Sequence, residues 1–125
     1  MRTRHSRAAL LAAATVALSA TAGGIAQAHV SVVSTTPTAG STAKLTLAAV
    51  KVTFNGPIRG GTLRVTGPGG KLASKGSGGR DPRNLKRLMV ALRGGLAAGG
   101  YTARWTATAA DGHAQQGSFS FRLKR

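Results

Sequence analysis

The chain has 125 residues and no cysteine, and 18 Lys and Arg face only two acidic residues, giving a formal net charge of +16. This length favours a single domain. The lack of cysteine excludes disulfides, thiolate metal sites and lipidation through a cysteine. The charge favours anionic partners such as membrane headgroups or cell-wall polymers. Because no run of Lys or Arg exceeds two residues, a solubilising surface is the alternative explanation.

The first 28 residues have the pattern of a secretory signal peptide. Arg2, Arg4 and Arg7 precede an apolar run at residues 8–20, and Ala26-Gln27-Ala28 forms a small-x-small cleavage site. We therefore expect residues 1–28 to be removed and residues 29–125 to form one exported domain, periplasmic or otherwise outside the cytoplasm. The run is shorter than the roughly 18 residues of a spanning helix, so no transmembrane segment is expected after cleavage. An uncleaved anchor is the alternative.

Three of the 18 basic residues lie before residue 29, so 15 face two Asp in the expected domain, a balance of +13. A surface of this charge suits envelope polymers better than nucleic acid, which an exported protein seldom meets. No nucleic-acid partner is predicted.

The remaining chain has the pattern of short strands separated by Gly, Pro and Ser. Apolar residues alternate with polar ones around Val52, Leu63 and Val90, and again near Ala103 and Phe121. Period-two alternation without a helical period predicts an all-β Greek-key β-barrel or immunoglobulin-like sandwich of about seven antiparallel strands. Trp105 is expected in the core, residues 71–74 in a short return strand, and the polar, glycine-rich residues 76–84 in a loop.

One stretch near the C-terminus concentrates the scarce reactive side chains. Asp111 and His113 flank Gly112, and in extended backbone residues two apart project from one face. A carboxylate and an imidazole could hold a metal ion, but two ligands bind it weakly. Cleavage after Ala28 would expose His29, whose α-amine and imidazole can chelate together. The metal ligands predicted are therefore His29, Asp111 and His113.

Six segments in order also resemble the CopC copper-resistance family. They are HV at residues 29–30, STTPTAGS at 34–41, VKVTF at 50–54, GYTARW at 100–105, ADGH at 110–113 and GSFSF at 117–121. The resemblance implies an immunoglobulin-like Greek-key barrel that binds one Cu(II) and serves copper resistance, buffering or delivery. It implies as ligands the N-terminal histidine, here His29, with Asp111 and His113. A CopD-type membrane copper importer is the partner that it implies.

The sequence departs from the family pattern in three ways. Gly56 stands where many members carry an acidic residue, so an outer carboxylate is missing. Met1 is expected to leave with the signal peptide and Met89 lies in a predicted strand, so the methionine-rich Cu(I) site of some members should be absent. The basic charge is also unusual for the family and argues against an acidic docking surface.

The donor set suits Cu(II), which prefers tetragonal N and O ligands and exceeds Zn(II) in the Irving–Williams order. Amine and imidazole ligands must be deprotonated, so binding should weaken as pH falls. Gln115, Gln116, Ser118 and Ser34 are candidates for outer hydrogen bonds to the ligands.

Two other functions fit parts of the sequence. A histidine-brace copper monooxygenase also begins at histidine, but the five aromatic residues lie mostly at core positions and leave few for a sugar-binding face. A basic polyanion-binding or cell-surface-binding domain would make the histidines incidental, and its binding should fall steeply with salt. Without a second nearby carboxylate, a cysteine or a nucleophile-elbow motif, no enzyme activity is predicted.

Overall fold

The computed structural model describes residues 30–125, which form eight strands and one short 3-10 helix. The strands are β1 (Val32–Thr36), β2 (Thr42–Lys44), β3 (Ala49–Phe54), β4 (Ile58–Thr66), β5 (Gly79–Arg80), β6 (Arg87–Ala91), β7 (Gly99–Ala109) and β8 (Ala114–Lys124), with the helix η1 (Pro68–Gly70) after β4. The predicted signal peptide and His29 lie outside the described residues.

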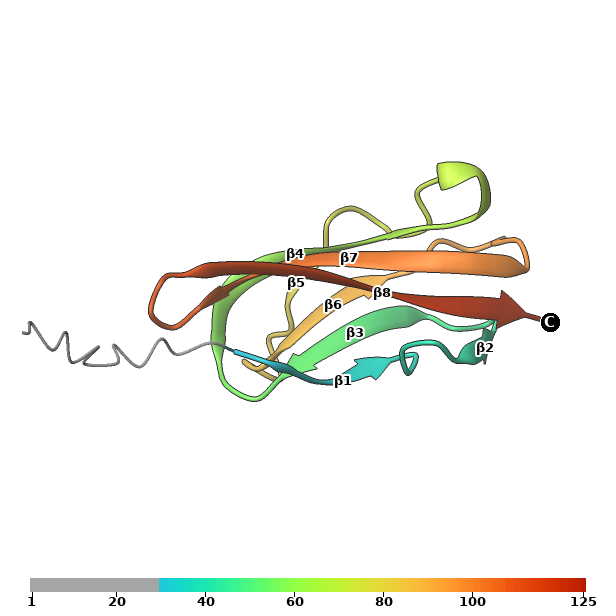
Figure 1. The fold of residues 1–125 in the computed structure, drawn as a ribbon. Helices are drawn as coiled ribbons and strands as arrows, with labels where there is room; N and C mark the ends of the chain where they lie inside the picture. The colour runs from blue at the N-terminus through green and yellow to red at the C-terminus, as the bar shows by residue number, and fades with distance from the viewer. Residues whose placement is uncertain (1–29) are drawn as a thin grey trace, which may run out of the picture.

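The strands form two four-stranded sheets that pack face to face (Figure 1). One sheet has the order β1-β3-β6-β5 and the other β2-β8-β7-β4, so the chain crosses repeatedly between the layers. Every pair is antiparallel except β2 with β8, which is parallel. The all-β prediction of about seven strands is confirmed, and the arrangement is an open sandwich rather than a closed barrel.

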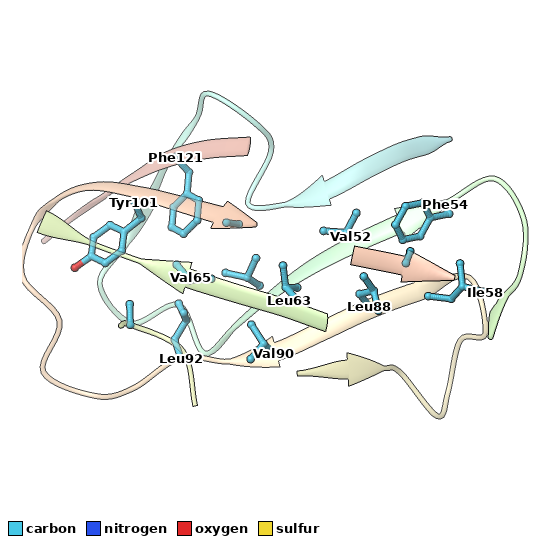
Figure 2. Packing of buried hydrophobic residues seen from close by; sticks show 14 of the residues in the cluster. Val52, Phe54, Ile58, Leu63, Val65, Leu88, Val90, Leu92, Tyr101 and Phe121 are labelled. Carbon is cyan, nitrogen blue, oxygen red and sulfur yellow. The ribbon is translucent and has the colours of Figure 1, made fainter. Parts of the chain in front are cut away.

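Alternating burial on β3 shows how the sequence makes this fold. Val50, Val52 and Phe54 are buried, whereas Lys51 and Thr53 are partly exposed on the opposite face. β6, next to β3 in the same sheet, and β4, in the opposite sheet, contribute further apolar side chains, and Figure 2 shows these side chains meeting between the sheets. Removing this apolar surface from water supplies the main force that holds the two layers together.

The hairpin of β7 and β8 pairs from Gly99 with Leu123 to Thr108 with Ala114. Trp105 is half-buried on the inner side of β7 and meets Phe54 edge to face at 5.0 Å between ring centroids. Its predicted role in packing is therefore correct, although it lies at the margin of the core. This long hairpin carries the Asp-Gly-His segment at its turn.

The expected loop at residues 76–84 contains the short strand β5, which pairs with β6. The next residue, Asp81, is only 3% exposed and forms an ion pair with Arg87. The segment is thus a loop except for this two-residue strand, and backbone pairing and the ion pair order its polar residues. At residues 71–74 only isolated bridges occur, joining Thr66 to Leu72 and Ser74 to Leu92, so no return strand forms.

No helix in residues 30–125 is long and apolar enough to cross a membrane.

Candidate metal centre

The turn between β7 and β8 brings Asp111 and His113 together. The Ala109 N–H donates to the His113 carbonyl and the Gly112 N–H donates to the Ala109 carbonyl, both at 2.9 Å. Gly112 has φ +90°, a backbone conformation that a residue with a Cβ rarely adopts. The Asp-Gly sequence thus forms a tight hairpin turn.

The Asp111 carboxylate contacts His113 through both of its oxygens. Oδ1 accepts a hydrogen bond of 3.0 Å from the His113 backbone N–H, and Oδ2 lies 2.9 Å from His113 Nδ1. The side chains are 27% and 63% exposed, respectively. The two residues were expected to share one face of a strand, and the structure joins them across a turn instead.

This pairing suits a metal-binding imidazole. If Nδ1 carries the proton and donates it to Oδ2, Nε2 keeps a free lone pair directed away from the carboxylate. A carboxylate in this position fixes the tautomer and orientation of the ring and raises its basicity. Nitrogen and oxygen donors are the ligands that Cu(II) prefers, so the pair fits two positions of such a site.

The start of the described chain lies against the strand that follows this turn. The Val30 N–H donates a 3.1 Å hydrogen bond to Oε1 of Gln115, two residues beyond His113. Val30 is itself buried, at 7% exposure. In Figure 1 the chain enters the sandwich at the end where the β7–β8 turn projects. The residue directly before Val30 is His29, the predicted third ligand, which lies outside the described residues.

Asn55 also fastens this segment. Its Oδ1 accepts from the Ser31 N–H, and its own N–H donates to the Ser31 carbonyl, both at 2.9 Å. A Cβ added to Gly56 would lie 3.7 Å from Val30 Cγ1. Gly56, which replaces the acidic residue of many CopC family members, therefore borders the N-terminal segment.

Within residues 30–125 no group of three His, Cys, Asp or Glu side chains is assembled. The structure brings together Asp111 and His113, two of the three predicted ligands. Among the suggested outer residues, Gln115 contacts Val30, whereas Gln116 and Ser118 line a hollow elsewhere on the sheet. Ser34 pairs with Thr53 between β1 and β3.

Arg59 near the turn was not predicted from the sequence. A Cβ added to Gly112 would lie 3.6 Å from Arg59 Nη1, so a guanidinium stands beside the turn. The register pairs Ile58 with Ala109 and is irregular between Ile58 and Gly60. Only knowledge that β4 pairs with the end of β7 would have revealed this neighbour.

A family model for the CopC domain matches residues 32–124. The chain belongs to the CopC domain family. This assignment confirms the resemblance found in the sequence, and the match covers nearly all of the described sandwich.

Two solved structures are similar to this CopC chain. CopC from Methylosinus trichosporium OB3b has a TM-score of 0.64 and 22% identity, covering 77% of this chain and 94% of that one. PcoC, a methionine-rich copper resistance protein from Escherichia coli, has a TM-score of 0.60 and 26% identity, covering 78% and 100%. No curated protein sequence matches significantly. Unlike the methionine-rich protein, this CopC chain has only two methionines.

Proposed function

We propose that this chain is an exported, non-enzymatic protein that binds one Cu(II) through His29, Asp111 and His113. The observation that carries the proposal is the contact between Asp111 and His113 on a turn beside the anchored Val30. The α-amine and imidazole of His29 would supply two further nitrogen donors. Together the three residues would offer one amine, two imidazoles and one carboxylate.

This donor set accounts for the choice of metal and oxidation state. Cu(II) heads the divalent series for N and O ligands, whereas thioether and thiolate ligands select Cu(I), and the chain has no cysteine. The only methionine among the described residues is Met89, which lies on β6 between Lys51 of β3 and Gly79 of β5. Such a site should hold Cu(II) more tightly than Zn(II).

The hydrogen bond from Val30 to Gln115 supports the part assigned to His29. Consecutive Cα atoms are about 3.8 Å apart, so a residue that precedes Val30 starts close to the strand leaving the Asp-Gly-His turn. A terminal residue ordinarily frays. Here the burial of Val30 and the paired hydrogen bonds between Ser31 and Asn55 hold the start of the described chain in place.

The proposal also covers where the protein acts and what it does with copper. The signal-like segment at residues 1–28 and the family membership support a role outside the cytoplasm in copper resistance. PcoC, the similar protein from Escherichia coli, is described as a copper resistance protein. The protein would buffer Cu(II) or deliver it to a CopD-type membrane importer.

The test compares protein that begins at His29 with protein that carries one additional residue before it. Both retain all of residues 30–125, and both are titrated with Cu(II) and examined by electron paramagnetic resonance. We expect the first to bind one equivalent with a nitrogen-rich tetragonal spectrum, and the second to lose affinity sharply because its amine is blocked. Equal, weak binding by both would exclude His29 as a ligand.

Two turn variants test the other ligands. Asp111→Asn keeps an oxygen that can accept from the His113 N–H but removes the negative charge, and His113→Ala removes the ring. Both should weaken Cu(II) binding while the sandwich remains folded. A variant of Asp111 that binds as the parent does would restrict the site to the histidines.

A further inference from the structure

A hollow on the outer face of the second sheet is distinct from the Asp-Gly-His turn. It has a volume of about 580 Å³ and is formed by three adjacent strands, β4, β7 and β8. Seven of its nine lining residues are polar and lie at outward-facing positions of the strands: Thr62, Arg64, Thr66, Arg104, Thr106, Gln116 and Ser118. The other two are Trp105 and Gly117, which alternate with them in the chain. We call this hollow the β4–β7–β8 groove.

Two arginines lie side by side in the groove. Arg64 on β4 is the direct register partner of Arg104 on β7, and both are exposed. Directly opposed residues have Cβ atoms about 4.5–5.5 Å apart, and like charges in this arrangement destabilise a sheet. The groove thus concentrates positive charge, which lowers the stability of the protein when no ligand is bound.

No acidic side chain of the described residues offsets this charge from within the groove. Asp81 is buried in its ion pair with Arg87, and Asp111 contacts His113 at the β7–β8 turn. Neutralisation must come from counterions or from a ligand.

The guanidinium groups are oriented but not saturated. Arg64 Nε donates to Ser77 Oγ at 3.1 Å, and Arg104 Nη1 donates to Thr66 Oγ1 at 3.3 Å. A guanidinium has five N–H donors, so donors remain on both after these bonds. Guanidinium groups on two neighbouring strands are suited to bidentate recognition of an oxyanion.

Neutral hydrogen-bonding groups lie in the adjacent row. Thr62, Thr106 and Gln116 are consecutive register partners across the three strands, next to the row of Arg64, Arg104 and Ser118. Thr62 Oγ1 and Thr106 Oγ1 are 2.7 Å apart. The paired hydroxyls and the amide could bind oxygens flanking a charged group.

We propose that the β4–β7–β8 groove is an oxyanion site that binds a phosphate or sulfate group between Arg64 and Arg104. The hydroxyl and amide row would contact the atoms that carry that group. This site is separate from the proposed copper site and does not depend on it. The binding of polyanions expected from the net charge would then take place at this groove.

The test uses purified protein expressed from the full sequence, titrated calorimetrically with inorganic phosphate, inorganic sulfate, polyphosphate and heparin. Side-chain Nε–H resonances of the arginines are followed by NMR in parallel. We expect saturable binding with selective shifts of Arg64 and Arg104. Binding of the inorganic ions indicates a site for a free ion or small headgroup, whereas binding of the polymers alone indicates a polymer-borne group. If no probe saturates, the proposal is wrong.

Two double variants of equal charge distinguish binding in the groove from general attraction of anions to a basic protein. Arg64→Gln with Arg104→Gln should lower affinity at least about tenfold. The control is Lys44→Gln with Lys124→Gln, which loses the same charge from a register pair outside the groove and should stay within about twofold. Equal losses in the two double variants would overturn the proposal.

A charge-preserving variant tests the geometry. Arg64→Lys with Arg104→Lys keeps the net charge and removes the planar fork, so affinity should still fall. Full affinity in this variant would show that charge alone is sufficient, which contradicts the proposed bidentate site. Thermal unfolding of each variant verifies that the exposed substitutions leave the fold intact.

Discussion

The backbone N–H of Val30 and the side-chain Oε1 of Gln115 form a 3.1 Å hydrogen bond between residues 85 positions apart in sequence. It fastens the first described residue to the strand that leaves the Asp-Gly-His turn. Val30 itself belongs to the buried core. The N-terminal segment and the candidate ligands Asp111 and His113 therefore depend on the same strand for their positions.

Replacing Gln115 with Ala should weaken Cu(II) binding by about 10- to 100-fold, as is typical when a group that positions a metal ligand is removed. The N-terminal segment would lose one anchor and spend more time away from the turn. The loss of one such hydrogen bond should reduce the free energy of unfolding by only about 0.5–1.5 kcal/mol. Competition titration with a copper chelator measures the first effect and urea unfolding the second.

The control for this variant is Gln116→Ala. Gln116 is the next residue on β8 but lines the groove on the outer face, so its loss should leave Cu(II) affinity unchanged. If Gln115→Ala reduced stability but not affinity, the hydrogen bond would serve the fold alone, and one support for His29 as a ligand would be lost.

Arg59→Gln should raise Cu(II) affinity about two- to fivefold at low salt, because a positive charge near a bound cation is repulsive even in water. The guanidinium lies close to Gly112, the residue that separates the candidate ligands Asp111 and His113 in the chain. The gain should shrink as ionic strength rises. Titrations at two salt concentrations measure it, with Arg83→Gln as an exposed, charge-matched control. Equal gains in both variants would point to net charge rather than to the position of Arg59.

The strands that sequence alone predicted are those with one face in the core. On β3, β7 and β8 burial follows the alternation of apolar and polar residues. β2 and β5 have only three and two residues, which is too short to show apolar alternation. They are strands only because their backbones pair with β8 and β6. Period-two patterns cannot reveal strands of this kind.

The residues of the candidate site likewise fall into those that the sequence could predict and those that it could not. Scarcity of acidic and histidine side chains singled out Asp111 and His113, because their contact is local and a turn joins them. Gln115 was suggested as an outer residue, but its partner Val30 was not, and Arg59 was missed because it reaches the turn across the β4–β7 register. Such contacts depend on strand order, which the linear pattern does not encode.

Gly117→Ala should destabilise the protein by about 1–3 kcal/mol, the usual cost of overpacking. A Cβ at this position would lie 2.5 Å from Trp105 Cζ2, so the indole must move away from β8. Movement would disturb its edge contact with Phe54. Because the chain has one tryptophan, its fluorescence spectrum should shift in the folded variant.

The matched control is Gly100→Ala on the same hairpin. Its added Cβ would have its nearest neighbour, Arg122 Nη1, at 3.8 Å, which is an ordinary contact. This variant should keep both the spectrum and the unfolding midpoint of the parent. Unchanged stability in Gly117→Ala would mean that Trp105 has room to move, and that its contact with Phe54 contributes little.

Asp81 should dominate the loss of stability in acid. The Arg83 backbone N–H, followed by the Arg87 side chain, holds the pKa of this carboxyl below its ordinary 3.8, although burial opposes the shift. A carboxyl whose pKa is lower in the folded than in the unfolded state stabilises the fold above the unfolded value. That stabilisation disappears as pH falls through the folded pKa. The urea midpoint of the parent should therefore drop between about pH 5 and pH 2.

Asp81→Asn should start from a lower urea midpoint at pH 7, because the amide cannot replace the ion pair with Arg87. Its midpoint should then change little as the pH is lowered, since the group that links protonation to unfolding is gone. With only two acidic side chains in the chain, Asp111→Asn is the natural control and should retain the acid-induced drop. Retention of that drop in Asp81→Asn and its disappearance in Asp111→Asn would instead assign the acid sensitivity to the β7–β8 turn.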